Sequence, residues 1–220
     1  ARQLNGKELS YNNIRDLDAA LTMCRSFERP AVAVLKHNNP CGAAVADTLE
    51  EAVRKGMEGD PMSAYGSIIG VNRELDEASA NYLAQPGHFV EAIIAPSFSQ
   101  KALEILTTVP KWHVNVRLLE CGGKEFTPAK PYWTARPLCG GSLLQDADVG
   151  TDPEEDWRVV TDKAPTEEQM KDLRFAWMMV RHVKSNAIVL AKDEMLVGVG
   201  AGQMSRVDSA RVAHRKSIDA

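Results

Sequence analysis

The chain has 220 residues, of which 44% are hydrophobic and 25% are charged. These proportions are typical of a globular protein with a packed core, and they exclude the disordered and fibrous classes. The formal net charge of -4 provides no overall basic field, so we expect no binding to nucleic acid. Four cysteines without C-x-x-C spacing favour reduced thiols, and no run approaches the ~20 apolar residues of a membrane span. We therefore expect a cytoplasmic protein that does not enter a membrane.

The first 120 residues alternate between helical and strand patterns. Apolar residues at three- and four-residue spacing predict a helix over 14–27, and PAVAVLK (30–36) predicts a strand that is apolar on both faces, as buried parallel strands are. The next six residues, HNNPCG (37–42), predict a tight turn because they combine proline and glycine. The elements expected downstream are a helix capped by Thr48 and Glu51, a strand at 66–71, a helix at 74–85, a strand at 89–96, a helix at 99–108 and a strand at 113–120.

The remaining residues predict a connection followed by a second group of elements. Residues 121–165 are rich in glycine, proline and acidic side chains, which is typical of a linking segment, here with a hairpin. Thr166 and Gln169 form a capping-box pattern at the start of a helix. Two strands follow, at 186–192 and 195–200, joined by a turn at Asp193 and Glu194, before a last helix at 205–217. We expect a layered α/β fold with a first unit over 1–120, a connection over 121–165 and the start of a second unit over 166–220.

Lys36 and His37 stand at the end of the strand at 30–36. Ligands of open α/β sheets bind at the carboxyl ends of strands, so the position favours a functional role. A histidine accepts a proton near neutral pH, and a lysine stabilises a developing negative charge. The alternative is that both are solvated turn residues, which is the commoner situation for an isolated Lys-His pair.

The glycine-rich segment GVGAGQMSR (198–206) lies between a strand and a predicted helix. Its backbone N–H groups and the positive end of the helix suit a phosphate or carboxylate, and Arg206 adds further donors. The segment lacks the glycine spacing of a dinucleotide fingerprint. The alternative is that its glycines serve a purely steric purpose.

Three further groups of residues are candidates for binding. Asn186 precedes a strand, where its amide supplies both a donor and an acceptor, and the alternative is that its segment is simply a turn. Tyr65 and Gly66 offer a stacking surface beside a close backbone approach, and Glu91 is a carboxylate within an otherwise apolar strand that needs a partner or a function.

Six segments in this order carry a resemblance to a known family. YNNI, KHNNPCG, SAYGSIIG, FVEAIIAP, HVKSNAIVLAK and GVGAGQMSR resemble the transformylase part of the AICAR transformylase/IMP cyclohydrolase family. The resemblance covers essentially the whole chain, although residues 121–165 contribute little. It implies a cytidine-deaminase-like α/β/α fold and a homodimer with active sites at the subunit interface. It also implies transfer of the formyl group of 10-formyltetrahydrofolate, a co-substrate, to the 5-amino group of aminoimidazole carboxamide ribonucleotide (AICAR).

The resemblance also implies individual roles. His37 would help deprotonate the amine, Lys36 would stabilise charge on the departing folate nitrogen, and Asn186 would orient the substrate carboxamide. The family usually has aspartate where this chain has Glu91. The substrate-binding positions by resemblance are Asn13, Tyr65, Gly66, Glu91, Gln203, Ser205 and Arg206.

The sequence departs from the family at both ends. The cyclohydrolase domain and an arginine- and tyrosine-containing upstream segment are absent, and the family continues beyond SIDA. We therefore expect a fragment that is inactive in isolation, and a non-catalytic dimerisation piece is one alternative. The other alternative is a cytidine-deaminase-like hydrolase. Its zinc signature, H-x-E with P-C-x-x-C, is not present, so no catalytic metal is expected.

Overall fold

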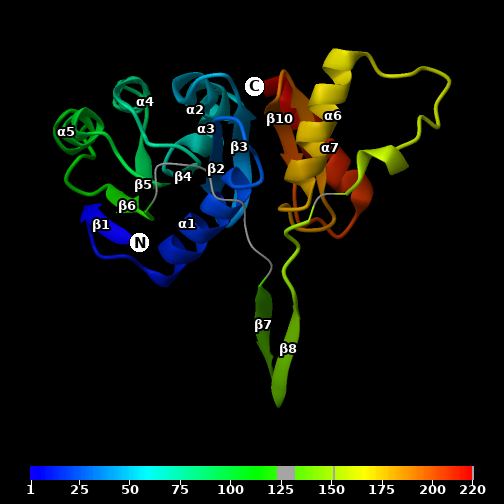
Figure 1. Cartoon of the computed structure of the whole chain (residues 1–220), viewed down its shortest axis with the longest axis horizontal. Helices are drawn as coiled ribbons and strands as arrows, with labels where there is room; N and C mark the ends of the chain where they lie inside the picture. Colours follow the sequence, from blue (N-terminus) through cyan, green and yellow to red (C-terminus); the bar gives the residue numbers. More distant parts are fainter. Residues whose placement is uncertain (123–131, 151, 220) are drawn as a thin grey trace.

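The computed structural model describes residues 1–122, 132–150 and 152–219. Most of its strands belong to one mixed sheet of eight strands, and Figure 1 shows this sheet running through the body of the molecule. In their order across the sheet the strands are β1 (Arg2–Asn5), β6 (Arg117–Glu120), β5 (Val90–Ala95), β4 (Ser67–Val71), β2 (Ala31–Lys36), β3 (Asn39–Val45), β10 (Met195–Gly200) and β9 (Ile188–Lys192).

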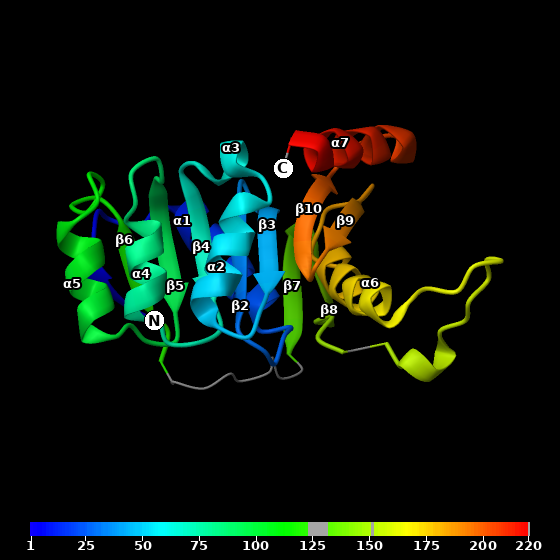
Figure 2. The same ribbon diagram turned by 90° about the horizontal axis from the view of Figure 1, so that it is seen from above.

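Helices cover both faces of the sheet, which confirms the expected α/β/α layers (Figure 2). One face packs against α1 (Tyr11–Cys24) and α6 (Glu167–Val180), which share a core cluster with β2 and β3. The other face packs against α2 (Leu49–Glu58), α4 (Glu77–Leu83) and α5 (Gln100–Thr108). A one-turn helix, α3 (Pro61–Ala64), follows α2, and α7 (Arg206–Asp219) packs on β10 and β9.

The prediction that residues 30–36 form a parallel strand is wrong. Strand β2 is antiparallel to both of its neighbours, β3 and β4, whereas β4, β5 and β6 are parallel to one another. The strand is apolar on both faces because α1 covers one face and α2 the other, and this pattern does not depend on strand direction. The carboxyl end of β2 therefore lies beside the amino ends of β4 and β5.

The predicted turn over residues 37–42 is shorter than expected. Only His37 and Asn38 form the loop, with φ angles of 52° and 64°, and Lys36 pairs directly with Asn39 in the β2–β3 hairpin. Two-residue hairpins of this kind require positive φ at both central positions. Residues 39–45, including Pro40, continue as strand β3, whose partner on its other side is β10.

Most other elements agree with the sequence patterns. Thr48 caps α2, the capping box of Thr166 and Gln169 begins α6, and the β9–β10 turn has positive φ at Asp193 and Glu194. Helix α1 begins three residues earlier than expected, because Ser10 and Asn13 form a capping box. Strand β6 is shorter than its pattern, and β1, which pairs antiparallel with β6, was not predicted.

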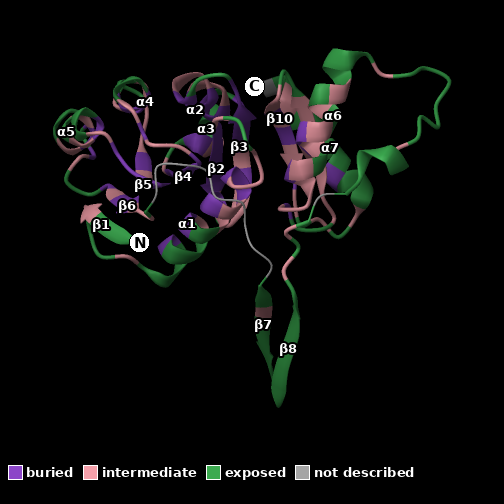
Figure 3. Cartoon of the chain, viewed as in Figure 1, coloured by how far each residue is buried: buried purple, intermediate pink, exposed green. Residues whose placement is uncertain are grey.

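The segment between the two groups of elements contains the predicted hairpin. Strands β7 (Trp133–Leu138) and β8 (Gly141–Asp146) form a separate two-stranded sheet that projects from the body (Figure 1). Its residues are exposed, with Thr134 intermediate (Figure 3). A short 3₁₀ helix, η1 (Glu154–Asp156), lies farther along, and part of the connection, 123–131, lies outside the described residues.

The proposed division into a first and a second unit stays a prediction. Strands on either side of the connection join one sheet, since β10 pairs with β3. Within the part of the chain that the structure describes, no helix is both long and apolar enough to cross a membrane.

Candidate functional site

Lys36 ends strand β2 with its ammonium group held by backbone oxygens. Its Nζ atom donates to the carbonyl oxygens of Tyr65, at 2.5 Å, and of Gly66, at 3.4 Å. Gly66 has a φ of 75° and donates its own N–H to the carbonyl of Phe89 at 2.7 Å. The ring of Tyr65 packs on that of Phe89, with centroids 5.4 Å apart, and remains 59% exposed. Lys36, Tyr65 and Gly66 thus form one structural unit, and the contact of Tyr65 and Gly66 with substrate stays a prediction.

His37 occupies the first loop position of the β2–β3 hairpin and is exposed. Helix α1 holds this loop in place through Arg15. The guanidinium of Arg15 donates to Asn38 Oδ1 at 3.2 Å, and Asn38 Nδ2 donates back to the carbonyl of Arg15 at 3.5 Å. Positive φ is uncommon for residues other than glycine, so these contacts help to maintain a loop geometry that presents the imidazole to solvent.

Asp16 is a residue of this site that the sequence reasoning missed. Burial raises the pKa of its carboxyl group, while the backbone N–H of Asn38 and the charge of His37 act in the opposite direction. Asp16 thus faces the Lys-His loop from α1. The signal that would have found it is its spacing of three from Asn13, which places both side chains on one helix face.

Asn13 and Glu91 contact each other at the amino ends of the parallel strands. Asn13 is 6% exposed, and its Nδ2 donates to Glu91 Oε1 at 3.2 Å. The same oxygen accepts from Arg117 at 3.3 Å, so the isolated carboxylate of β5 has two partners. The Oδ1 atom of Asn13 caps α1 by accepting from Ser10. These bonds give both residues a structural function, and their contact with substrate stays a prediction.

The glycine-rich segment serves helix packing at two positions. A Cβ atom on Gly198 would lie 2.2 Å from the carbonyl oxygen of Ala213, and one on Gly200 would lie 1.9 Å from that of Ser209. Only glycine allows α7 to approach β10 this closely. The steric interpretation therefore holds for these two glycines, and the anion-binding hypothesis rests on residues 201–206.

Asn186 is tied to that turn. Its Nδ2 donates to the carbonyl oxygens of Gln203, at 3.0 Å, and Met204, at 3.2 Å, and its own carbonyl oxygen accepts from Ser209 at 2.8 Å. Ser205 accepts the backbone N–H of Asp208 at 3.4 Å at the start of α7, while Arg206 is exposed. The structure brings together four predicted residues here, namely Asn186, Gln203, Ser205 and Arg206.

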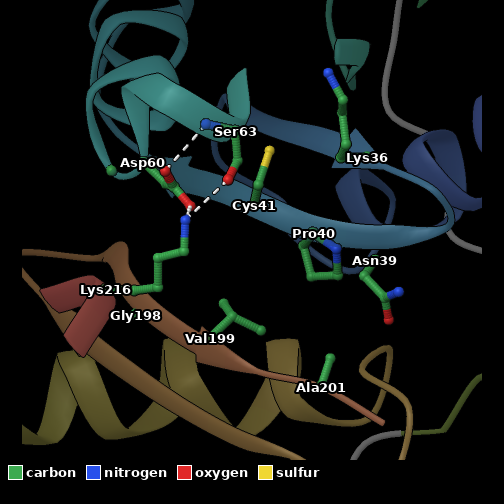
Figure 4. Close-up of a pocket in the computed structure, with 11 residues that line it drawn as sticks. Lys36, Asn39, Pro40, Cys41, Asp60, Ser63, Gly198, Val199, Ala201 and Lys216 are labelled. Carbon is green, nitrogen blue, oxygen red and sulfur yellow. Dashed lines mark hydrogen bonds and ion pairs between the residues drawn. The ribbon is translucent and has the colours of Figure 1, made fainter. Parts of the chain in front are cut away.

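A small pocket of about 170 Å³ lies between Lys36 and the first part of the glycine-rich segment (Figure 4). Its walls include Lys36, Asn39 and Cys41 from the β2–β3 hairpin, and Val199 and Ala201 from the glycine-rich segment. Burial raises the pKa of Cys41 to about 12, so its thiol stays protonated at neutral pH and donates to the carbonyl of Val34 at 3.3 Å. The pocket therefore presents Lys36, a protonated thiol and the ion pair of Asp60 and Lys216, without a thiolate nucleophile.

Metal ligands are not gathered here. Among residues 1–122, 132–150 and 152–219, no three His, Cys, Asp or Glu side chains lie close enough to hold a metal ion.

The pattern of the AICARFT/IMPCHase bienzyme family matches residues 1–216. The chain belongs to this family. The match covers both the hairpin that carries Lys36 and His37 and the turn that carries Arg206, so the family resemblance extends across both halves of the site.

Individual members of the family are also similar to the chain. It is 56% identical over 219 residues to the bifunctional purine biosynthesis protein PurH of Rhodopirellula baltica, covering 100% of the chain and 42% of the relative. The PurH proteins of Bacillus cereus and Anoxybacillus flavithermus are 49% and 48% identical, over 97% and 100% of the chain and 40% and 41% of the relatives. The chain thus spans about two fifths of the length of these relatives.

Proposed function

We propose that the chain carries the formyl-transfer site of a purine-biosynthesis enzyme. The reaction moves a formyl group from 10-formyltetrahydrofolate to the 5-amino group of AICAR. The observation that carries this proposal is the pocket lined by both Lys36, the chain neighbour of His37, and Ala201 of the glycine-rich segment. The relatives' name, bifunctional purine biosynthesis protein, is consistent with this reaction class.

The residues supply the proton transfers that the reaction requires. A bond forms between the amine nitrogen and the formyl carbon, and the bond between that carbon and the folate nitrogen breaks. The amine loses one proton to exposed His37, and the folate nitrogen gains one, which the protonated His37 returns, so the protons balance. The ammonium of Lys36 stabilises negative charge as it develops and favours departure of the folate.

The second half of the site binds the nucleotide. Arg206 is exposed at the first turn of α7, where its charge and the backbone N–H groups of the turn favour a phosphate. Asn186 orients the carboxamide through the oxygen of its own side chain, since its Nδ2 already donates to the turn.

We also propose a cytoplasmic homodimer. The support is the projecting hairpin, whose apolar side chains include Trp133, at 73% exposed, and Leu144, at 61%. A second copy of the chain is the partner that would cover them, because exposed apolar patches of this kind mark interfaces.

The proposal is tested by assaying the complete natural polypeptide with AICAR and 10-formyltetrahydrofolate. We expect formylated nucleotide and tetrahydrofolate in equal amounts, and no loss of rate after dialysis against a chelator. Ammonia release or stoichiometric zinc would instead support the deaminase-like alternative.

The isolated 220-residue chain should show little formyl-transfer activity, because misplacing a reacting group by about 1 Å lowers the rate roughly 10²-fold. Full activity of the isolated chain would contradict that expectation.

A further inference from the structure

Lys216, near the end of α7, forms a three-membered cluster with the start of α3. Its Nζ atom lies 2.7 Å from Asp60 Oδ2 and donates to Ser63 Oγ at 3.1 Å (Figure 4). Asp60 also caps α3, since its Oδ1 accepts the backbone N–H of Ser63 at 3.1 Å. Lys216 thus binds both the N-cap residue of α3 and a residue within that helix.

The cluster is enclosed. The side chains of Lys216 and Asp60 are 25% and 13% exposed, compared with 70% and 50% for the surface pair of Lys101 and Glu77. Burial acts to raise the pKa of Asp60, but the hydrogen bonds from Lys216 and Ser63 outweigh it, so the pKa is lowered. Enclosed ion pairs with such additional hydrogen bonds lose more on removal of one partner than surface pairs do.

Helix α3 connects this cluster to the catalytic lysine. The helix has four residues, Pro61–Ala64, and its C-cap is Tyr65. The carbonyl oxygens of Tyr65 and Gly66 are the acceptors of the Lys36 ammonium. A single helical turn is not stable by itself, so the placement of these two carbonyls depends on what holds the helix.

We propose that Lys216 is a positioning residue for Lys36. It fixes α3 through Asp60 and Ser63, and α3 in turn fixes the two carbonyl oxygens that direct the Lys36 ammonium. This inference rests on the proposed formyl-transfer function, and it adds a residue from the opposite end of the chain to the site.

The test uses the complete natural polypeptide and the variant Lys216→Met. We expect kcat to fall about tenfold, because even a small displacement of the Lys36 ammonium weakens its action on the reacting groups. The KM for the nucleotide should stay within about twofold of the wild-type value. Lys101→Met, which breaks a pair of the same type on the surface, should leave kcat unchanged. If Lys216→Met fails to fold, Ser63→Ala removes one of the two bonds and should lower kcat in the same direction.

A double-mutant cycle separates positioning from a general structural effect. In a Lys36→Met background, Lys216→Met should cause no additional loss of kcat, because the group that it positions is already absent. An equal loss in both backgrounds, or no loss in either, would overturn the proposal.

A readout without turnover distinguishes failure of this inference from failure of the proposed function. Acylation of Lys36 by acetic anhydride, followed by mass spectrometry, should be about 2- to 10-fold faster in Lys216→Met, as expected for a weakened hydrogen bond. If the wild type transfers no formyl group and this acceleration is still seen, the positioning stands and the reaction assigned to the site is wrong. Unchanged acylation would contradict the positioning itself.

Discussion

The ammonium group of Lys36 donates a hydrogen bond of 2.5 Å to the carbonyl oxygen of Tyr65, 29 residues farther along the chain. This bond joins the carboxyl end of β2 to Tyr65, which stands two residues before β4. Because β2 and β4 are antiparallel, the end of one strand meets the beginning of the other. The position of the lysine head group therefore depends on the backbone at Tyr65 and Gly66.

Gly66→Ala should lower kcat of the complete polypeptide by about tenfold or more, since small displacements of a reacting group are costly. A Cβ atom there would lie 3.2 Å from the ring of Phe89 and 3.3 Å from Lys36 Nζ, at a φ of 75°. Gly87→Ala is a matched control, because Gly87 has a φ of 98° but nothing within 4 Å of the added atom. Steady-state kinetics should show a lower kcat for Gly66→Ala but not for Gly87→Ala. Equal losses of kcat in the two variants would mean that backbone strain, and not displacement of Lys36, causes the effect.

Arg206→Ala should weaken binding of the nucleotide much more than binding of the dephosphorylated nucleoside. A charged fork contact to a phosphate is among the stronger hydrogen bonds, and the nucleoside lacks that group. Calorimetric titration with both ligands measures the difference. Arg211→Ala, on the same helix but paired with Asp208, is the control. Equal losses for nucleotide and nucleoside would exclude Arg206 from phosphate binding.

The free energy of unfolding of the chain should decrease as the pH is lowered from about 6.5 to about 4, because of His182. Burial and the charge of Arg181 lower the pKa of His182 to about 4, although Asp148 acts in the opposite direction. In this interval the unfolded state binds the proton and the folded state does not, so stability rises with pH at up to about 1.4 kcal/mol per unit.

Denaturant unfolding at several pH values measures this slope. His182→Gln should flatten it, because glutamine does not titrate, whereas His214→Gln at an exposed position should leave it unchanged. A slope that persists in the His182 variant would assign the pH dependence to other groups.

Much of the fold follows from local sequence patterns. The capping residues Thr48 and Thr166 and the turn at Asp193 and Glu194 stand where the sequence predicts them, because caps and short turns are determined by neighbouring residues. The direction of β2 was not predictable in this way. Its apolar pattern indicates burial on both faces. Its antiparallel pairing depends instead on a two-residue hairpin at His37 and Asn38, which lacks the glycine common in such turns.

The residues of the candidate site also divide into those that local sequence patterns predict and those that they do not. Lys36, His37 and the glycine-rich turn are visible in the sequence, as motifs at the ends of strands. Asp16 and Lys216 are not, because each is related to the site through residues distant in the chain. The pKa of Asp16 responds to Asn38 and His37, and Lys216 pairs with Asp60. Such contacts depend on strand order, which no local pattern specifies.

The most direct test of the account is the formyl-transfer rate of the complete polypeptide carrying His37→Ala. A general base acts mainly in the transition state, so we expect turnover to fall by about 10²- to 10⁴-fold while the affinity for AICAR changes little. His214→Ala, at another exposed position, should have no effect. Spectroscopic measurement of tetrahydrofolate formation, with nucleotide affinity determined in parallel, gives both quantities. Unchanged turnover in His37→Ala would contradict the assignment of this hairpin as the catalytic centre.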